Sequence, residues 1–136
     1  MGHAYTVVPE HQADEVLTQA NPVSGTLYEV LATTKNVRVI SIGTNITWGV
    51  TQPTPLEIVV TVDGQTVIFS KTNPVSATAY EAAFESDGGT QLSNYNVAVP
   101  MRAFLLEGRS VRIQVRITWA VTQPTPLRVR VVYAKY

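Results

Sequence analysis

The stretches ITWGVTQPTPL, residues 46–56, and ITWAVTQPTPL, residues 117–127, are identical at ten of eleven positions. A second pair precedes them: NPVSGTLYEV at 21–30 and NPVSATAYEA at 73–82 share seven of ten positions. The NPVS blocks are 52 residues apart and the ITW blocks 71 apart, so the second copy carries 19 additional residues. Because a solenoid needs at least three stacked units, two copies favour two related halves of one β-sandwich.

Strict alternation of apolar and polar residues surrounds the second copy. In SVRIQVRITW, residues 110–119, every second side chain is apolar and the others are polar. In LRVRVVYAKY, residues 127–136, Leu127, Val129, Val131 and Tyr133 alternate against Arg128 and Arg130. A period of two is typical of strands half-buried against a core. In NVRVISIGTNITW, residues 36–48, the period shifts by one residue after Val39, which predicts a β-bulge.

Asp63 and Gly64 stand between two β-rich runs in LEIVVTVDGQTVIFS, residues 56–70. Asp-Gly is typical of a type I′ hairpin turn, in which both central residues take positive φ. With TAYEAAF at 78–84 and RAFLLEG at 102–108, the chain has about eight short strands. The predicted fold class is an all-β antiparallel sandwich of about eight strands, with internal duplication, over residues 21–136.

Helical features occur in PEHQADEVLTQ, residues 9–19, which has a proline at its start and acidic residues in its first turn. We therefore expect residues 1–20 to form an N-terminal arm or a short helix outside the sandwich.

The TQPTP segments are predicted to be stiff loops, each joining a long strand to its neighbour. A residue before proline is pushed towards extended geometry, and proline cannot sit in a paired central strand. Two interpretations are open: both copies keep the segment because both need the same connection, or the two loops form a contact surface at one end of the sandwich. The candidate contact residues are Gln52, Pro53 and Pro55 in the first copy and Gln123, Pro124 and Pro126 in the second.

Composition indicates one folded domain of 136 residues, with 45% hydrophobic and 15% charged residues. The absence of cysteine excludes disulfides, thiolate metal sites and cysteine nucleophiles. No apolar run is long enough to cross a bilayer, and no signal peptide is visible at the N-terminus. The net charge is zero, but residues 1–95 carry −6 and residues 96–136 carry +6. This asymmetry favours self-complementarity, within one chain or between chains.

Catalytic chemistry is not indicated. The only histidines, His3 and His11, lie in the N-terminal segment, so no Ser-His-Asp arrangement can form in the core. We expect neither an enzyme nor a cofactor. An enzymatic alternative would need carboxylates such as Glu81 and Glu85 to face one pocket.

Four arginines are the strongest candidates for partner contacts. Arg112 and Arg116 share the outer face of one predicted strand, and Arg128 and Arg130 share that of the next. If these strands pair, four guanidinium groups gather on one sheet face, where they could bind carboxylates or phosphates. Solvation of the sheet, a contact between subunits and nucleic acid are the alternatives. The neutral overall charge and few neighbouring aromatics disfavour nucleic acid.

A second candidate site lies in the additional residues of the second copy. Its polar and aromatic side chains suit a ligand-binding loop of a carbohydrate-binding module, which needs no catalytic groups. The residues are Asp87, Asn94, Tyr95 and Asn96.

In its strand count, duplicated hairpin, turn-linked pair PMRAFLLEGRSVRI (100–113) and lack of cysteine and of a signal, the chain resembles single jelly-roll structural proteins of viruses and phages. Capsid decoration proteins, turrets and spike bases have this size. The resemblance implies a jelly-roll-like sandwich, a homo-oligomer with a trimer favoured, a major capsid protein as a partner, and a location in a virion or assembled shell. We therefore expect a self-assembling structural protein, with a lectin-like module as the alternative.

Overall fold

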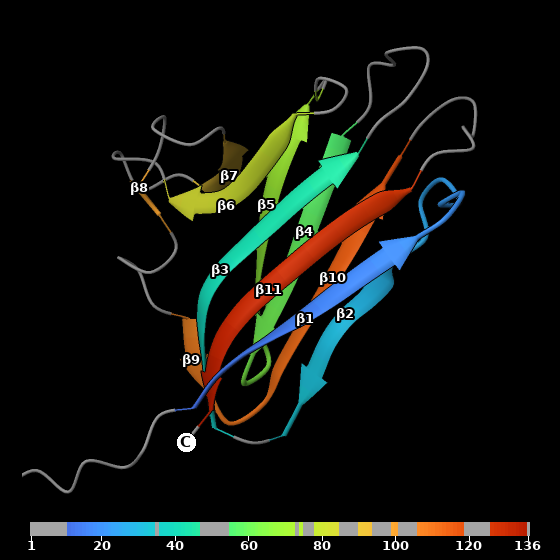
Figure 1. Ribbon diagram of the computed structural model, residues 1–136. Helices are drawn as coiled ribbons and strands as arrows, with labels where there is room; N and C mark the ends of the chain where they lie inside the picture. The colour runs from blue at the N-terminus through green and yellow to red at the C-terminus, as the bar shows by residue number, and fades with distance from the viewer. Residues whose placement is uncertain are drawn as a thin grey trace, which may run out of the picture.

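The computed structural model describes residues 11–34, 36–46, 55–72, 74, 78–84, 90–93, 99–100, 106–118 and 126–135. Two antiparallel sheets form a sandwich in this part of the chain (Figure 1), so the predicted fold class is confirmed. The strands are β1 (His11–Gln19), β2 (Tyr28–Thr33), β3 (Val37–Ile46), β4 (Pro55–Val62), β5 (Gln65–Thr72), β6 (Ala79–Phe84), β7 (Thr90–Ser93), β8 (Val99–Pro100), β9 (Leu106–Gly108), β10 (Val111–Ile117) and β11 (Leu127–Lys135).

The strand order is that of a jelly roll. One sheet has the order β1-β11-β3-β6-β7, with β8 added to β6 and β9 added to β3, and the other has the order β2-β10-β4-β5. Eight strands, β1–β6, β10 and β11, therefore form two four-stranded layers whose successive strands change sheet except at the β4–β5 hairpin. This double-sheet arrangement is the jelly-roll solution to closing an antiparallel sandwich.

The sequence duplication appears as an internal two-fold relation. Ile46 on β3 pairs with Leu127 on β11, and Ile117 on β10 pairs with Leu56 on β4. The ITW blocks are 71 residues apart, so Ile46 corresponds to Ile117 and Leu56 corresponds to Leu127. The Ile46–Leu127 pair and the Ile117–Leu56 pair are therefore equivalent. The 71-residue offset maps β3 and β4 onto β10 and β11, while the 52-residue offset of the NPVS blocks maps β1 and β2 onto β5 and β6. The two copies thus pair with each other instead of forming separate domains.

The core consists of the inward faces of both sheets. On β10 every second side chain, from Val111 to Ile117, is buried, which confirms the predicted alternation. On β3 the buried positions change phase between Val39 and Ile42, and the pairing with β11 shifts between Val132 and Tyr133. The predicted bulge is therefore present, with Ile40 as the additional residue.

The β4–β5 hairpin has the predicted turn, with φ of 48° at Asp63 and 84° at Gly64. Asp63 also joins this turn to the β9–β10 turn. Its Oδ1 accepts hydrogen bonds from the backbone N–H groups of Arg109 (3.0 Å) and Ser110 (2.9 Å). Its own N–H donates to the carbonyl of Ser110 at 2.8 Å. The sequence does not reveal this junction, because its partners are 46 and 47 residues away.

Gly108 is the point of closest approach in this junction. A Cβ at Gly108 would lie 2.5 Å from Cγ1 of Val62 and 2.7 Å from Oδ2 of Asp63. Both neighbours are restrained, since valine is stiff at χ1 and the Asp63 carboxylate is fixed by its hydrogen bonds. We expect Gly108→Ala to lower the free energy of unfolding by about 1–3 kcal/mol, the usual cost of overpacking.

Urea denaturation would measure this loss, with Gly43→Ala as the matched control. Gly43 also lies within a strand, but a Cβ there would have nothing within 4 Å, so its substitution is expected to change stability by at most about 0.5 kcal/mol. Equal stability of the two variants would contradict the tight junction.

The prediction of an arm or a short helix for residues 1–20 is wrong over the part that the structure describes, and residues 1–10 lie outside the described residues. Residues His11–Gln19 form strand β1, not a helix or a detached arm, and all nine residues pair with β11. The sandwich therefore begins before residue 21. Asp14, one of the acidic residues that suggested a helix N-terminus, instead pairs with Arg130 of β11, 116 positions away.

The expectation that each TQPTP loop joins neighbouring strands is also wrong. β3 and β4, which flank the first loop, lie in different sheets, and so do β10 and β11. Pro55 is the first residue of β4, the strand position that proline tolerates. Each loop thus connects one layer to the other.

Candidate functional site

The four candidate arginines do not gather on one face. Because β10 and β11 lie in different sheets, Arg112 and Arg116 are on the outer face of one sheet and Arg128 and Arg130 on that of the other. The predicted four-arginine cluster is therefore wrong. The cluster required β10 and β11 to pair with each other. Instead, β10 pairs with β2 and β4, and β11 pairs with β1 and β3.

Three of the arginines form ion pairs with acidic residues from the first half of the chain. Nε of Arg112 lies 2.9 Å from Oε1 of Glu29, and Nε of Arg116 lies 3.0 Å from Oε1 of Glu57. Nε of Arg130 lies 3.0 Å from Oδ2 of Asp14. The predicted self-complementarity within the chain is confirmed. The Arg112–Glu29 and Arg130–Asp14 pairs are exposed, and exposed ion pairs contribute about 0–1 kcal/mol each. The Arg116–Glu57 pair is partly buried.

Arg128 differs from the other three. Its side chain is exposed, and no ion pair to it is found within the described residues. It lies opposite Thr18 of β1, and Arg130 lies opposite Val16. The outer face of β1 and β11 thus presents one paired and one unpaired guanidinium group next to an edge strand.

Described residues that flank the repeated loops meet at one end of the sandwich. The carbonyl of Pro55 accepts a hydrogen bond from the N–H of Thr118 at 3.2 Å, and the carbonyl of Ile117 accepts one from the N–H of Gly25 at 2.9 Å. The first NPVS block therefore contacts the strand that leads into the second TQPTP loop. Pro126 is half-buried just before β11. Gln52, Pro53, Gln123 and Pro124 lie outside the described residues, as do Trp48 and Trp119.

Tyr28 explains part of the NPVS motif. Its hydroxyl accepts a hydrogen bond from the N–H of Val23 at 2.8 Å, and Pro22 is buried beneath the loop. Asn21 takes a positive φ of 49°, which asparagine tolerates better than most residues. Tyrosine recurs in the second block at Tyr80, and β5 and β6, like β1 and β2, lie in different sheets; Asn73 lies outside the described residues.

The candidate ligand loop of Asp87, Asn94, Tyr95 and Asn96 lies outside the described residues. Of the two carboxylates considered for catalysis, Glu81 is half-buried on β6, and Glu85 also lies outside. Within the described residues, no group of three histidine or acidic side chains is placed to hold a metal ion. No helix in this part of the chain is long and apolar enough to cross a membrane.

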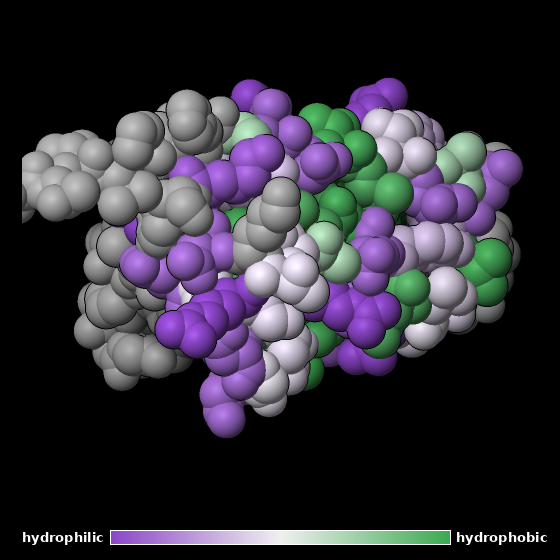
Figure 2. Space-filling view, turned by 90° about the horizontal axis from the view of Figure 1, so that it is seen from below, coloured by the Kyte–Doolittle hydropathy of each residue, from purple (hydrophilic) through white to green (hydrophobic). Residues whose placement is uncertain are grey.

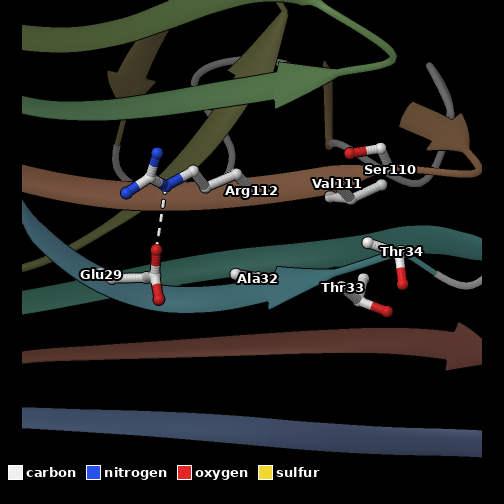
Figure 3. Close-up of a pocket in the computed structure, with 7 residues that line it drawn as sticks. All are labelled: Glu29, Ala32, Thr33, Thr34, Ser110, Val111 and Arg112. Carbon is white, nitrogen blue, oxygen red and sulfur yellow. Dashed lines mark hydrogen bonds and ion pairs between the residues drawn. The ribbon is translucent and has the colours of Figure 1, made fainter.

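A groove with several polar side chains among its lining residues, called here the polar groove, lies between β2 and β10, near the end of the molecule that holds the Asp63 turn. Its volume is about 490 Å³. Figure 3 shows the Arg112–Glu29 ion pair at one end of the groove and the hydroxyls of Thr33, Thr34 and Ser110 at the other. Figure 2 views the molecule from this end, where hydrophilic side chains surround a smaller hydrophobic area. The groove offers hydrogen-bonding groups but no aromatic ring.

Tyr133 is the titratable group whose environment is most altered within the described residues. It is buried on β11, opposite Ala13 of β1. Burial raises the pKa of Tyr133, and the nearby carboxylates of Glu15 and Asp14 raise it further. Each cause disfavours the phenolate in the folded state.

The raised pKa predicts sensitivity to alkaline pH. Because the folded pKa lies above the unfolded one, the contribution of Tyr133 to stability is intact below about pH 10 and is lost as the pH rises through the folded pKa. We expect the thermal midpoint of Tyr133→Phe to fall less steeply above pH 10 than that of the unmodified protein. Parallel curves for the two proteins would contradict this role.

A feature that the sequence analysis missed is the uncovered side of the sandwich, formed by the edge strands β1 and β2 and called here the open flank. In the described part of the chain no strand pairs with the free edge of either. On this flank Val16 is 61% exposed, the highest value among the exposed large hydrophobic residues. The sequence signal was hidden, because β1 was interpreted as an arm or a helix.

The fold defines the chain as a jelly-roll β-sandwich protein. No protein family matches the sequence, and no curated protein matches it. Among solved structures, the chain is similar to one from the crystal structure of the T13 IBDV viral particle, with 8% identity and a TM-score of 0.39. The match covers 93% of this chain and 35% of that chain, so this chain spans about a third of the structure it matches. The fold class rests on the strand order, not on this likeness.

Proposed function

We propose that the chain is a non-enzymatic structural protein that assembles through its β-sandwich, as a capsid decoration, minor capsid or spike component of a virion. The observation that carries the proposal is the open flank. β1 has nine consecutive residues whose outer edge is not paired by any strand of the described residues, and such edges pair with other chains unless they are protected.

The fold agrees with an assembly role. Jelly rolls recur in viral capsid and lectin domains, although a fold by itself does not define a function. Three of the four outward arginines, Arg112, Arg116 and Arg130, are paired with carboxylates, and a paired charge can be covered by another subunit at lower cost than an unpaired one. The virion location follows from the fold analogy.

The proposed partners are other copies of the chain and a major capsid protein. The viral resemblance favours a trimer as the basic unit. Neither a membrane nor nucleic acid is part of the proposal, since the net charge of the chain is zero and binding to either surface is driven largely by basic charge.

Mass photometry and light scattering at micromolar concentration test assembly directly. We expect a defined oligomer of two or more copies at physiological salt. A strict monomer at every concentration and salt tested would contradict the proposed function.

The polar groove supports carbohydrate binding as a second candidate function. Its hydroxyls and its ion pair are groups that hydrogen-bond to sugars, and lectins use the same fold. A glycan array with the unmodified protein, Arg112→Ala and the control Arg128→Ala tests it. Selective binding that Arg112→Ala abolishes and Arg128→Ala retains would favour this candidate, and no binding to any glycan would contradict it.

A further inference from the structure

The internal two-fold relation allows the two flanks of the sandwich to be compared position by position. β1 and β5 are equivalent edge strands, because Leu17 lies opposite Val129 and Phe69 lies opposite Ile58. Val16 and Ile68 are then equivalent outward-facing residues. A difference in the exposure of equivalent residues therefore reflects what covers each flank, not a difference in sheet geometry.

The flank formed by β5 and β6 is covered by the second copy's own additional strand. β7 pairs with β6 and contacts β5 (Figure 1). Phe69 is fully buried and Ile68 is 43% exposed. On the open flank, Leu17 is only half-buried and Val16 is 61% exposed. The first copy has no equivalent of β7, since residues 34–36 alone separate β2 from β3.

Of the two strands on the open flank, β1 is the better edge for strand addition. β2 carries a bulge at Val30, where its pairing with β10 shifts, and bulges discourage edge-to-edge pairing. β1 pairs with β11 over nine residues with no shift. Its backbone is therefore straight enough to continue the sheet.

We propose that a second copy of the chain covers β1, and that the two β1 strands pair antiparallel across a two-fold axis centred on Val16. This inference rests on the proposed function, because it names the surface through which assembly occurs. The contact makes one continuous sheet from the two copies. A two-fold contact joins two copies and adds no further ones. The rest of each copy's surface therefore stays available for other contacts, including a trimer contact.

The charged side chains of β1 disfavour some of the possible registers and are compatible with this one. Directly opposite residues of antiparallel strands share a face, so the axis must pass through a residue position. Centring on Asp14 or Glu15 would place like charges opposite each other, which is destabilising. Centring on Val16 places Val16 opposite itself, Glu15 opposite Leu17 and Asp14 opposite Thr18.

Charge complementarity supports the same register. Thr18 lies between Arg128 on β11 and, in the proposed pair, Asp14 of the second copy. The long Arg128 side chain can reach past the small threonine to that carboxylate. Each Asp14, already 3.0 Å from its own Arg130, would then lie between two guanidinium groups. The exposed Arg128 thereby gains a partner.

Disulfide trapping tests the register. Because the chain has no native cysteine, the introduced cysteine can form a disulfide only with its copy in another chain. Opposite residues in antiparallel strands have Cα atoms about 4.5–5.5 Å apart, within the range of about 4.4–6.8 Å that disulfides accept. We expect Val16→Cys to form a covalent dimer under mild oxidation. Thr18→Cys should not, since the two copies of position 18 would be about 13 Å apart along the strands. Ile68→Cys, on the covered flank, is the control for random collision.

A charged substitution tests the same contact without cross-linking. Val16→Lys places two ammonium groups opposite each other and should weaken the contact by about tenfold or more, so that the mass of the assembly falls by half. The matched control Ile68→Lys, at the equivalent position, should leave the mass unchanged. Circular dichroism confirms folding, which both exposed sites should tolerate.

The outcomes separate this inference from the proposed function. Specific cross-linking of Val16→Cys and loss of assembly in Val16→Lys support the β1 contact. An oligomer that neither substitution affects would overturn the β1 contact while leaving the assembly proposal standing. Equal cross-linking of Val16→Cys and Thr18→Cys would overturn the register. A protein that is monomeric throughout would overturn both proposals.

Discussion

Replacing Phe69 with alanine is expected to lower the free energy of unfolding by about 3–5 kcal/mol, the usual cost of emptying a buried aromatic site. Phe69 is the largest fully buried side chain in the described residues. It lies on edge strand β5, opposite Ile58 of β4. Its burial depends on both the core and the neighbouring β7, so the cavity left by alanine would be only partly filled by relaxation.

Urea denaturation of Phe69→Ala beside Ile68→Ala tests this expectation. The two residues are adjacent on the same strand, but Ile68 is 43% exposed. Ile68→Ala should therefore lower the free energy of unfolding by no more than about 1 kcal/mol. If Phe69→Ala does not fold, Phe69→Leu keeps most of the volume and should lose less than about 1.5 kcal/mol. Similar losses at positions 68 and 69 would contradict the alternation of β5.

Leu56→Ala and Leu127→Ala are each expected to lower the free energy of unfolding by about 2–5 kcal/mol. Both leucines are fully buried near the start of the strand that follows a TQPTP loop. Leu56 pairs with Ile117, and Leu127 pairs with Ile46. Since the internal two-fold relation exchanges these pairs, the two losses should agree within about 1 kcal/mol.

Denaturant titrations of both single variants and of the double variant test the symmetry. The unmodified protein and the conservative variants Leu56→Met and Leu127→Met serve as controls, because methionine keeps the volume and usually costs less than about 1.5 kcal/mol. Losses that differ by 2 kcal/mol or more would show that the two copies are packed differently despite their near-identical ITW blocks, which would contradict the mapping of β4 onto β11.

Local sequence predicted the parts of the fold that depend on neighbouring residues. The alternation in β10, the phase shift after Val39 and the turn at Asp63 and Gly64 were all correct, because each is determined by a few adjacent positions. The charge asymmetry correctly indicated self-complementarity, which the Arg116–Glu57 pair illustrates.

The errors concern relations between distant segments. β1 is polar and begins with helix-like signals, but its nine-residue partner on β11 overrides local propensity, as tertiary pairing often does in strands. A proline-rich loop looks the same whether it returns to its own sheet or crosses to the other. The predicted four-arginine cluster was wrong for this reason, because the loop between β10 and β11 crosses to the other sheet. Val16 escaped notice because exposure at an edge is a property of the assembled sheet.

The pairing of β1 with β11 also determines how the chain can fold. Asp14 and Arg130 are separated by 116 positions, so this sheet closes only when both ends of the sequence have been brought together. Contacts of such long range slow folding, since the chain entropy must be lost before they form. During synthesis, β1 therefore stays unpaired with β11 until β11 has left the ribosome. In that interval its backbone is open to pairing with neighbouring nascent chains.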